Sequence, residues 1–236
     1  MVNIIPLASS SRGNAYYIED NTTPLLLDAG IPYTQIQKGL NFQTSQLKGC
    51  LITHEHKDHC KAVEDLLRAG IDIYMSAGTK EALDIDSHRI KIIRVKKLFE
   101  IGTWKILPFE LKHDANEPLG FYMRNKAGEN LLYATDTFYL KDKFANLNYI
   151  MIECNHSREI LNQKVKDGVI SLQQKKRIIK THFGLEQVIK FLKVNNLSGV
   201  KEIWILHLSD RNSDAEQFKR DVQAETGKMV FVAEKG

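Results

Sequence analysis

The segment from Thr53 to His59 carries three of the chain's eight histidines, with a glutamate and an aspartate, directly after an apolar run. Imidazole nitrogens and carboxylate oxygens are good ligands for zinc, manganese or iron. Side chains two residues apart in an extended segment point the same way, so His54 and His56 are expected to converge on one point. Asp58 and His59 then open a predicted helix. Four ligand-type side chains around one turn exceed the need of one open catalytic ion and favour two adjacent ions.

Three later apolar runs are each followed by another ligand-type residue. His113 follows WKILPFEL, Asp136 follows the run LLYA, and His207 follows IWIL. The loops that leave strands are where sheet proteins commonly build their sites. With the first four residues, these make seven candidate ligands, which is three for each ion plus one bridging carboxylate. A histidine-rich turn that arose by chance would not be expected to have such partners downstream.

The elements that must position these residues are predicted from hydrophobic patterns. Short runs rich in Val, Ile, Leu, Phe and Tyr recur along the chain and are typical of strands in a buried sheet. Amphipathic patterns predict helices over residues 58–69, 185–194 and 214–226. Strands dominate the first two thirds, and helices alternate with strands after that. The pattern predicts an α/β fold with helices on the outer faces of the sheets, and the absence of a linker predicts one domain over residues 1–236.

Composition limits the classes of protein that the chain can belong to. A hydrophobic fraction of 43% and a charged fraction of 26% are ordinary for a soluble globular protein. No apolar run approaches the roughly 20 residues that span a bilayer, and the N-terminus does not resemble a signal peptide. We therefore expect a cytoplasmic protein without a membrane partner. Three scattered cysteines do not make a disulfide framework, and none is predicted to be a ligand.

Two segments are candidates for contact with an anionic substrate. One is basic, with a single acid, Asp167, against six cations within 17 positions: Lys164, Lys166, Lys175, Lys176, Arg177 and Lys180. Such a strip suits a phosphate backbone, although a solvated helix face is the commoner explanation of a charge run. The other segment, SSSRGN, offers Ser11, Arg12 and Asn14 to a phosphate, unless it only makes a turn between two strands.

The motifs THEHKDH, KHDA, YATDT and LHLS, in this order and spacing, resemble those of the metallo-β-lactamase fold superfamily. The match runs from LLLDAG, which begins at Leu25, to LHLSD. The resemblance implies an αβ/βα four-layer sandwich, in which two mixed sheets have outer helices and a two-metal site lies at one edge. One departure is local, because family members often have glycine where this chain has Lys61 and Ala62. We expect this to alter helix packing and not metal binding.

The resemblance also implies a role for each candidate ligand. The first ion would be held by His54, His56 and His113, and the second ion by Asp58, His59 and His207. Asp136 would bridge the two ions, and Asp28 would support the ligand loop from behind. Both ions are expected to be divalent, either zinc or manganese.

A more specific resemblance is to the YycJ/WalJ-like branch, which has counterparts of the segments HDANEPLGFYM, IECNHSREIL and LHLSDRNSD of this chain. That branch is associated with 5′-exonuclease activity on DNA, and RNase Z-like nucleases are its wider relatives. In the branch the opening loop usually reads Ser-Gly-Ser-x-Gly-Asn, and Ser10 replaces its glycine here. The branch motif also contains Glu153, Asn155 and His156, to which the sequence assigns no role.

His182 favours phosphodiesters among the substrates of the superfamily. It matches the extra histidine of RNase Z-like nucleases, which contacts the scissile phosphate and helps protonate the leaving group. It also precedes an amphipathic helix, whose N-terminus would favour an anion. Without the resemblance, a structural role under that helix would be the simpler interpretation. Asp58 is expected to orient the hydroxide that the two metals activate.

The sequence thus predicts a metal-dependent phosphodiesterase, above all a nuclease of the 5′-exonuclease type with DNA preferred to RNA. A cyclic-nucleotide phosphodiesterase is the alternative, and a thioesterase or lactonase would need neither His182 nor the basic strip. A binding module without catalysis is disfavoured by the complete ligand set. Exonuclease against endonuclease cleavage and the oligomeric state, a homodimer included, stay open.

Overall fold

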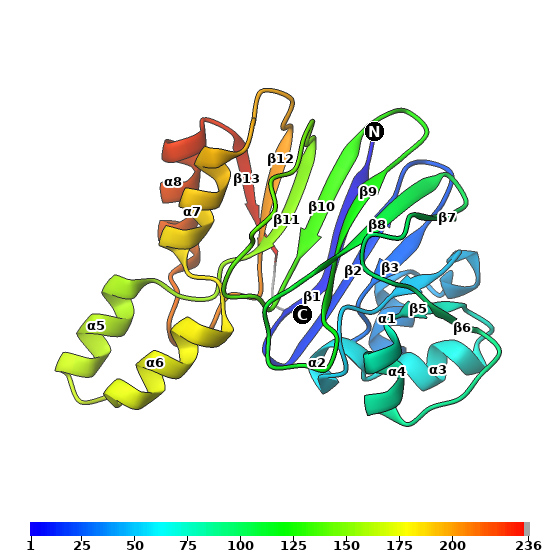
Figure 1. The fold of residues 1–236 in the computed structure, drawn as a ribbon, viewed down its shortest axis with the longest axis horizontal. Helices are drawn as coiled ribbons and strands as arrows, with labels where there is room; N and C mark the ends of the chain where they lie inside the picture. Colours follow the sequence, from blue (N-terminus) through cyan, green and yellow to red (C-terminus); the bar gives the residue numbers. More distant parts are fainter. Residues whose placement is uncertain (234–236) are drawn as a thin grey trace. The chain divides into compact units, whose positions relative to one another are not determined.

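The computed structural model describes residues 1–233, and Figure 1 draws their ribbon. Two compact units divide these residues. Unit 1 consists of Met1–Glu110 and Ala115–Asn130, and unit 2 consists of Leu111–Asp114 and Leu131–Ala233. Within residues 1–233, no helix combines the length and the apolar character needed to cross a membrane. The expectation of a single domain stays a prediction.

Unit 1 contains a six-stranded mixed sheet in the order β1-β2-β3-β4-β5-β6. Its strands are β1 (Asn3–Ser10), β2 (Gly13–Glu19), β3 (Leu25–Leu27), β4 (Cys50–Leu51), β5 (Ile73–Met75) and β6 (Ile90–Ile92). The pairs β1-β2 and β2-β3 are antiparallel, whereas β3 to β6 run parallel. Parallel strands are buried on both faces, which explains why β3 is three leucines in a row.

The remaining elements of unit 1 are short helices and a three-stranded meander. The helices are α1 (Tyr33–Gly39), the 3-10 turn η1 (Thr44–Gln46), α2 (Lys57–Cys60), α3 (Val63–Arg68) and α4 (Ala77–Leu83). The meander is antiparallel and consists of β7 (Phe99–Ile101), β8 (Trp104–Glu110) and β9 (Leu119–Arg124). Leu26, Ile36 and Leu66 belong to one buried cluster that joins the sheet to its helices.

The single helix predicted over residues 58–69 is wrong, because the chain forms α2 and α3 with a break between them. Two backbone hydrogen bonds draw the segment after β3 against this break. Ala29 N donates to His59 O at 2.7 Å, and Ala62 N donates to Ala29 O at 2.8 Å. The amide of Ala62 is therefore not available to continue the first helix.

Unit 2 is built on four parallel strands and four helices. The strands are β10 (Asn130–Ala134), β11 (Tyr149–Glu153), β12 (Glu202–Leu206) and β13 (Met229–Val232), paired in that order. The helices are α5 (Arg158–Lys166), α6 (Leu172–Thr181), α7 (Leu185–Val194) and α8 (Ala215–Thr226). In Figure 1, α7 and α8 lie side by side next to β13, whereas α5 and α6 form a separate pair.

The structure confirms two of the predicted helices, both in unit 2. Helix α7 covers the predicted residues 185–194 and buries Leu185, Val188 and Leu192. Helix α8 begins after Asp214, whose side chain accepts a hydrogen bond from Gln217 N at 2.9 Å, and this is a standard N-cap. The sequence did not predict α5 or α6 as helices.

Candidate metal centre

Three candidate site residues leave their strands in the left-handed backbone region. Asp28 follows β3 with φ 56°, Asp136 lies two residues after β10 with φ 47°, and His207 follows β12 with φ 52°. This region is uncommon for residues other than glycine, and Asp and His are among the types that enter it most readily. All three side chains are buried. The same local device therefore turns each of these side chains at the end of a strand.

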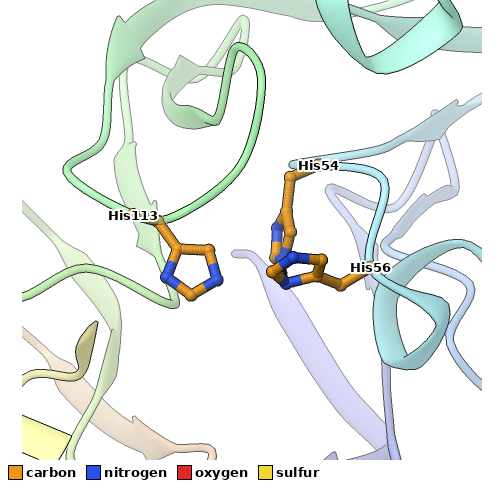
Figure 2. A group of neighbouring side chains, drawn as sticks. All are labelled: His54, His56 and His113. Carbon is orange, nitrogen blue, oxygen red and sulfur yellow. Dashed lines mark hydrogen bonds between the residues drawn. The ribbon is translucent and has the colours of Figure 1, made fainter. Parts of the chain in front are cut away.

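His54 and His56 converge within unit 1, as the extended segment predicts. His54 Nε2 lies 3.1 Å from His56 Nδ1, and the two rings meet nearly edge to face. Figure 2 shows both side chains on the segment that leads into α2, and it also draws His113, which belongs to unit 2. His54 Nδ1 lies 3.0 Å from the Thr53 hydroxyl, which fixes the ring from its other side.

His59 is held by a buried carboxylate. Asp28 Oδ2 lies 2.8 Å from His59 Nδ1, and neither side chain is exposed. The same carboxylate accepts hydrogen bonds from the backbone N of Thr53 at 2.8 Å and from its hydroxyl at 2.9 Å. With the Nδ1 proton directed at Asp28, the Nε2 lone pair of His59 is the one suited to a metal. The supporting role predicted for Asp28 fits this geometry.

Asn14 lies behind the ligand loop and not at the surface. Its side chain is fully buried, and its amide nitrogen lies 3.1 Å from His59 Nε2 and 3.3 Å from the Asp58 carbonyl. Its amide oxygen accepts a hydrogen bond from the Tyr16 hydroxyl, which in turn lies 2.7 Å from Ser9 Oγ. The predicted contact of Asn14 with substrate therefore needs correction, because burial gives it a supporting position beside His59.

The backbone of Asp58 is reached by a glycine of the neighbouring loop. A Cβ atom on Gly30 would lie 1.6 Å from the Asp58 carbonyl oxygen, so no other residue fits there without a shift. Gly30 N also donates to Asn14 O at 2.8 Å. The Asp58 side chain is 24% exposed, and its Oδ2 lies 3.5 Å from His59 Nε2. Asp58 is thus, like His56, a partly accessible member of the histidine motif in unit 1.

Unit 2 gathers the later candidate ligands. His113 Nε2 lies 3.8 Å from Asp136 Oδ2, and Asp136 Oδ1 is hydrogen-bonded to His207 Nδ1. The segment that carries His113 is fixed to the loop after β10, because Lys112 N donates to the Thr137 hydroxyl at 3.0 Å. These three predicted ligands come together although they are separated by up to 94 positions in the chain, from 113 to 207.

His182 faces a carboxylate that the sequence left without a role. Its Nδ1 lies 2.6 Å from Glu153 Oε1, and Glu153 is fully buried at the end of β11. Burial lowers the pKa of His182, but the carboxylates of Glu153, Asp136 and Asp114 together raise it to about 9. Donor atoms of Asp136, Glu153, His182 and His207 all lie within 4.8 Å of one another.

The predicted place of His182 at a helix N-terminus is wrong. His182 is the C-cap of α6, and α7 begins three residues later with Gly184 as its N-cap. The position of His182 instead depends on Glu153, whose Oε2 accepts hydrogen bonds from the backbone N of Thr137 and of Phe183.

Asn155 and His156, which belong to the same sequence motif as Glu153, also have defined positions in the structure. Asn155 Nδ2 donates to the His207 carbonyl at 3.0 Å, and Asn155 N donates to the Phe183 carbonyl at 2.8 Å. Asn155 thus joins the loop after β12 to the segment around His182. His156 is fully buried, and neither of its ring nitrogens has a hydrogen-bond partner among the described residues. The motif spacing alone did not reveal either role.

The remaining candidates for substrate contact are exposed. Ser11 and Arg12 form the two-residue turn between β1 and β2, as the alternative interpretation expected, and Arg12 N donates to Ser10 Oγ at 3.2 Å. Lys176 and Arg177 lie exposed on α6. Ser11 and Arg12 are accessible to a phosphate, and their place in the turn is explained without one.

The types of donor atom are those that divalent metal ions bind. Unit 1 brings together imidazole nitrogens of His54 and His56, and unit 2 brings together two carboxylates and two imidazoles. Burial raises the pKa of Cys60 to about 12 and that of Cys50 and Cys154 well above the ordinary range. Since the thiolate is the form that binds metals, these thiols are poor ligands. The fit supports a site made of His and Asp.

Comparisons with known proteins agree with one another. The family described as the beta-lactamase superfamily domain matches residues 23–201. The exodeoxyribonuclease WalJ of Streptococcus pneumoniae is 32% identical over 231 residues, which cover 89% of this chain and 82% of that protein. The exodeoxyribonuclease YycJ of Bacillus anthracis is 28% identical and covers 92% and 86%, respectively.

A solved structure gives the fold independently of sequence identity. The metallo-beta-lactamase fold protein YhfI from Bacillus subtilis superimposes with a TM-score of 0.77, covering 100% of this chain and 97% of that one, at 14% identity. This likeness confirms the predicted fold class, an α/β fold with two mixed sheets and outer helices. At that identity it says nothing of the reaction.

Proposed function

Because the chain belongs to the beta-lactamase superfamily, we propose that it is a metal-dependent hydrolase of phosphodiester bonds, and specifically an exonuclease that acts on DNA. Two relatives that match along most of their length bear the name exodeoxyribonuclease. The observation that carries the proposal is the pair formed by His182 and Glu153 beside Asp136 and His207. A β-lactam, thioester or lactone does not need such a proton donor beside the metal ligands.

The proposed ligand set is the one that the motifs predict, and its use of residues from both units rests on sequence and family. We assign His54, His56 and His113 to the first ion and Asp58, His59 and His207 to the second, with Asp136 bridging. Two divalent ions held by these residues, zinc or manganese, would lower the pKa of water and stabilise negative charge on a phosphate. The ligands on the protein must be deprotonated for this, and Asp28 keeps His59 in the required tautomer.

The protein's own acid–base chemistry is assigned to His182 and Asp58. His182 directs Nδ1 at Glu153, so the proton on Nε2 is the one that it would donate to the leaving oxygen or use to hold the scissile phosphate. Asp58, which is partly exposed, would orient the attacking water. Ser11 and Arg12 on the β1–β2 turn, and Lys176 and Arg177 on α6, are the proposed contacts to the rest of the substrate.

A hydrolysis panel tests this function. It contains single-stranded and duplex DNA, RNA, cyclic nucleotides and a β-lactam, each with zinc or manganese added. We expect turnover of DNA from its ends, with one or both metals. Exclusive turnover of cyclic nucleotides would replace the nuclease by the alternative phosphodiesterase, and turnover of the β-lactam alone would refute both.

Elemental analysis tests the metal assignment independently of activity. The reconstituted protein should carry two ions per chain, and His54→Ala should lose the first. Asp58→Ala and His59→Ala should weaken binding of the second. A reconstituted wild-type protein without metal would refute the centre itself.

A further inference from the structure

Two adjacent aromatic side chains lie exposed beside the candidate ligand Asp136. Phe138 is 41% exposed and Tyr139 is 54% exposed, and they are called here the aromatic pair. Within residues 1–233, the only other exposed aromatic side chain is that of Phe42, in unit 1. Single exposed apolar residues are common on protein surfaces, but two in succession at a candidate site call for an explanation.

Packing of the protein core does not account for the aromatic pair. Its two chain neighbours are the residues that enter the interior, since Thr137 is fully buried and Leu140 is 8% exposed. Among the described residues, neither ring of the pair makes a ring–ring or cation–π contact. The segment is thus anchored on both sides of the pair, and the two rings are left at the surface.

Hydrogen bonds fix the backbone of the aromatic pair. Phe138 N donates to the Lys112 carbonyl at 3.2 Å, and the Thr137 hydroxyl donates to the Tyr139 carbonyl at 3.0 Å. Lys112 N in turn donates to that hydroxyl at 3.0 Å. The rings are therefore carried by a held segment of unit 2, and a surface that is already ordered loses less entropy when a ligand binds.

The same segment is attached to the supports of other candidate site residues. Lys112 directly precedes His113 in the chain. Thr137 N donates at 3.0 Å to Glu153 Oε2, and the other oxygen of that carboxylate faces His182. The backbone of the aromatic pair is thus bonded to two of the structures that position the site in unit 2.

The aromatic pair also lies close to Asp136 along the chain. Two residues of extended chain span at most about 7 Å, so Phe138 Cα lies within this distance of Asp136 Cα. A nucleotide with its phosphate beside Asp136 would have its base within reach of the pair. Phenylalanine has no donor for a phosphate, whereas the face of an aromatic ring suits a flat, apolar partner. Stacking of bases on aromatic side chains is a regular way to bind single strands.

We propose that the aromatic pair stacks on a nucleobase that flanks the scissile phosphate, so that the protein recognises a base as well as a phosphate at the end of a strand. This inference rests on the proposed function and adds to it a requirement for the base. A strand end that has lost its bases would then be a poor substrate, because it has nothing to stack. Contacts to phosphates alone would not distinguish the two kinds of end.

The test variant is Phe138→Leu/Tyr139→Leu, which keeps apolar side chains at both positions but removes the flat rings. Phe42→Leu makes the same kind of change at the exposed aromatic residue of unit 1 and is the control. A third variant, Phe138→Tyr/Tyr139→Phe, exchanges the two residues and keeps both rings. All proteins are full-length and reconstituted with metal, and sedimentation velocity gives their oligomeric state.

Two short single-stranded DNA oligonucleotides are compared, which differ only in whether their two terminal nucleotides carry bases. Fluorescence anisotropy measures the binding of each one, with phosphorothioate linkages that slow cleavage. The kcat/KM for hydrolysis is measured on the same two sequences with ordinary linkages. Combining loss of the rings with loss of the bases isolates the contact between them, as in a double-mutant cycle.

We expect the wild type to bind the intact oligonucleotide about 5–150-fold more tightly than the one without terminal bases, which is what stacking on aromatic side chains contributes per base. The Phe138→Leu/Tyr139→Leu variant should lose this preference, because its affinity falls only for the intact end. Phe42→Leu should bind both oligonucleotides like the wild type. The variant that exchanges the two residues should retain the preference.

A wild type that binds both oligonucleotides equally would overturn the inference without recourse to any variant. Equal losses on both oligonucleotides in Phe138→Leu/Tyr139→Leu would also overturn it, and a simultaneous change in sedimentation would show that the aromatic pair joins two copies of the chain. In either case, cleavage of DNA by the wild type would leave the proposed function standing. A base preference that depends on the rings, in a wild type that cleaves no DNA, would uphold the inference and refute the nuclease.

Discussion

His182 Nδ1 lies 2.6 Å from Glu153 Oε1, at the end of the buried strand β11. The second oxygen of that carboxylate accepts two backbone hydrogen bonds, from Thr137 and Phe183, so Glu153 cannot turn away. A negative charge held in this place keeps a proton on His182. The pair consequently has the form of a proton donor with its fixed counter-charge.

Removing His182 should therefore separate metal binding from catalysis. His182→Ala is expected to keep its metal ions and to lose about 10²–10⁴-fold in the rate of DNA hydrolysis, the usual contribution of a general acid. On a nitrophenyl ester, whose leaving group needs no proton, the loss should be much smaller. The rates on both substrates and the metal content provide the check.

Glu153→Gln is the companion variant for the same role. Glutamine can still accept from His182 but does not supply the charge, so the loss on DNA should be smaller than for His182→Ala and should grow with pH. Similar losses of His182→Ala on both substrates would instead identify a phosphate clamp. Loss of metal would make His182 a structural residue, and full activity on every phosphodiester would refute its role.

A second prediction concerns the carboxylate behind His59. Asp28→Asn keeps the size of the side chain, but only one of its two polar atoms can accept a hydrogen bond. The variant therefore cannot accept hydrogen bonds from both Thr53 and His59 as the carboxylate does. We expect the affinity for one of the two ions to fall by about 10–100-fold, as is typical when a group that supports a metal ligand is lost. Competition with a chelator measures this affinity. The exposed residue Asp86, changed to Asn, is the control, and equal affinities in both variants would contradict the support role.

Asn14 provides a third test, because its buried amide has partners that are lost together. In Asn14→Ala, the Tyr16 hydroxyl and the carbonyls of Ser10 and Asp58 lose their hydrogen bonds to this side chain. The free energy of unfolding of the metal-free protein should fall by about 1–3 kcal/mol, measured in urea. Ser11→Ala, on the exposed turn, should change it by less than about 0.5 kcal/mol. A stable Asn14→Ala protein with only a raised KM would restore the substrate contact predicted from the sequence.

The buried ring of His156 predicts a pH dependence of stability. Burial, followed by the charges of His182 and Arg158, lowers the pKa of His156 to about 4. The unfolded chain takes up this proton near pH 6.5, so the stabilising contribution is complete above that pH and is lost as the pH falls toward 4. Over this window the term is on the order of 3 kcal/mol.

Urea unfolding of the metal-free protein at pH 7.5 and pH 5 measures this term. His156→Leu should lose less stability than the wild type between the two pH values, because its side chain takes up no proton. His88→Leu, at an exposed histidine, should behave like the wild type. An unchanged pH dependence in His156→Leu would show that other groups cause it.

The sequence predicted the strands well because their apolar runs are nearly uninterrupted. The run NYIMIE is β11, in which all five residues are buried, and EIWIL is β12. The short strand β7 was missed, since only Phe99 and Ile101 mark it. The break between α2 and α3 could not be read from the sequence either, because it is made by a hydrogen bond to Ala29, which is distant in the chain.

For the site too, features marked by the local sequence were predicted, and features made by contacts distant in the chain were not. The motif spacing identified candidate ligands that do converge within each unit, such as Asp136 and His207. It did not reveal that Asn14 is buried or that Glu153 faces His182, because both depend on which strands become neighbours. A polar residue at the end of an otherwise apolar run, as in YIMIE, was the available signal for Glu153.

The left-handed backbone at Asp28, Asp136 and His207 limits how the sequence would change at these positions if the activity were no longer selected. A backbone of this kind tolerates Gly, Asn, Asp and His, and it disfavours β-branched residues whether or not a metal is bound. Neutral drift at these three positions should therefore run toward glycine and asparagine. His54 and His59 have no such backbone restriction, so the backbone does not limit which residue types replace them. A descendant that has lost its activity would then still have residues typical of the site at these three positions. The backbone conformation would be the reason for them, and not the function.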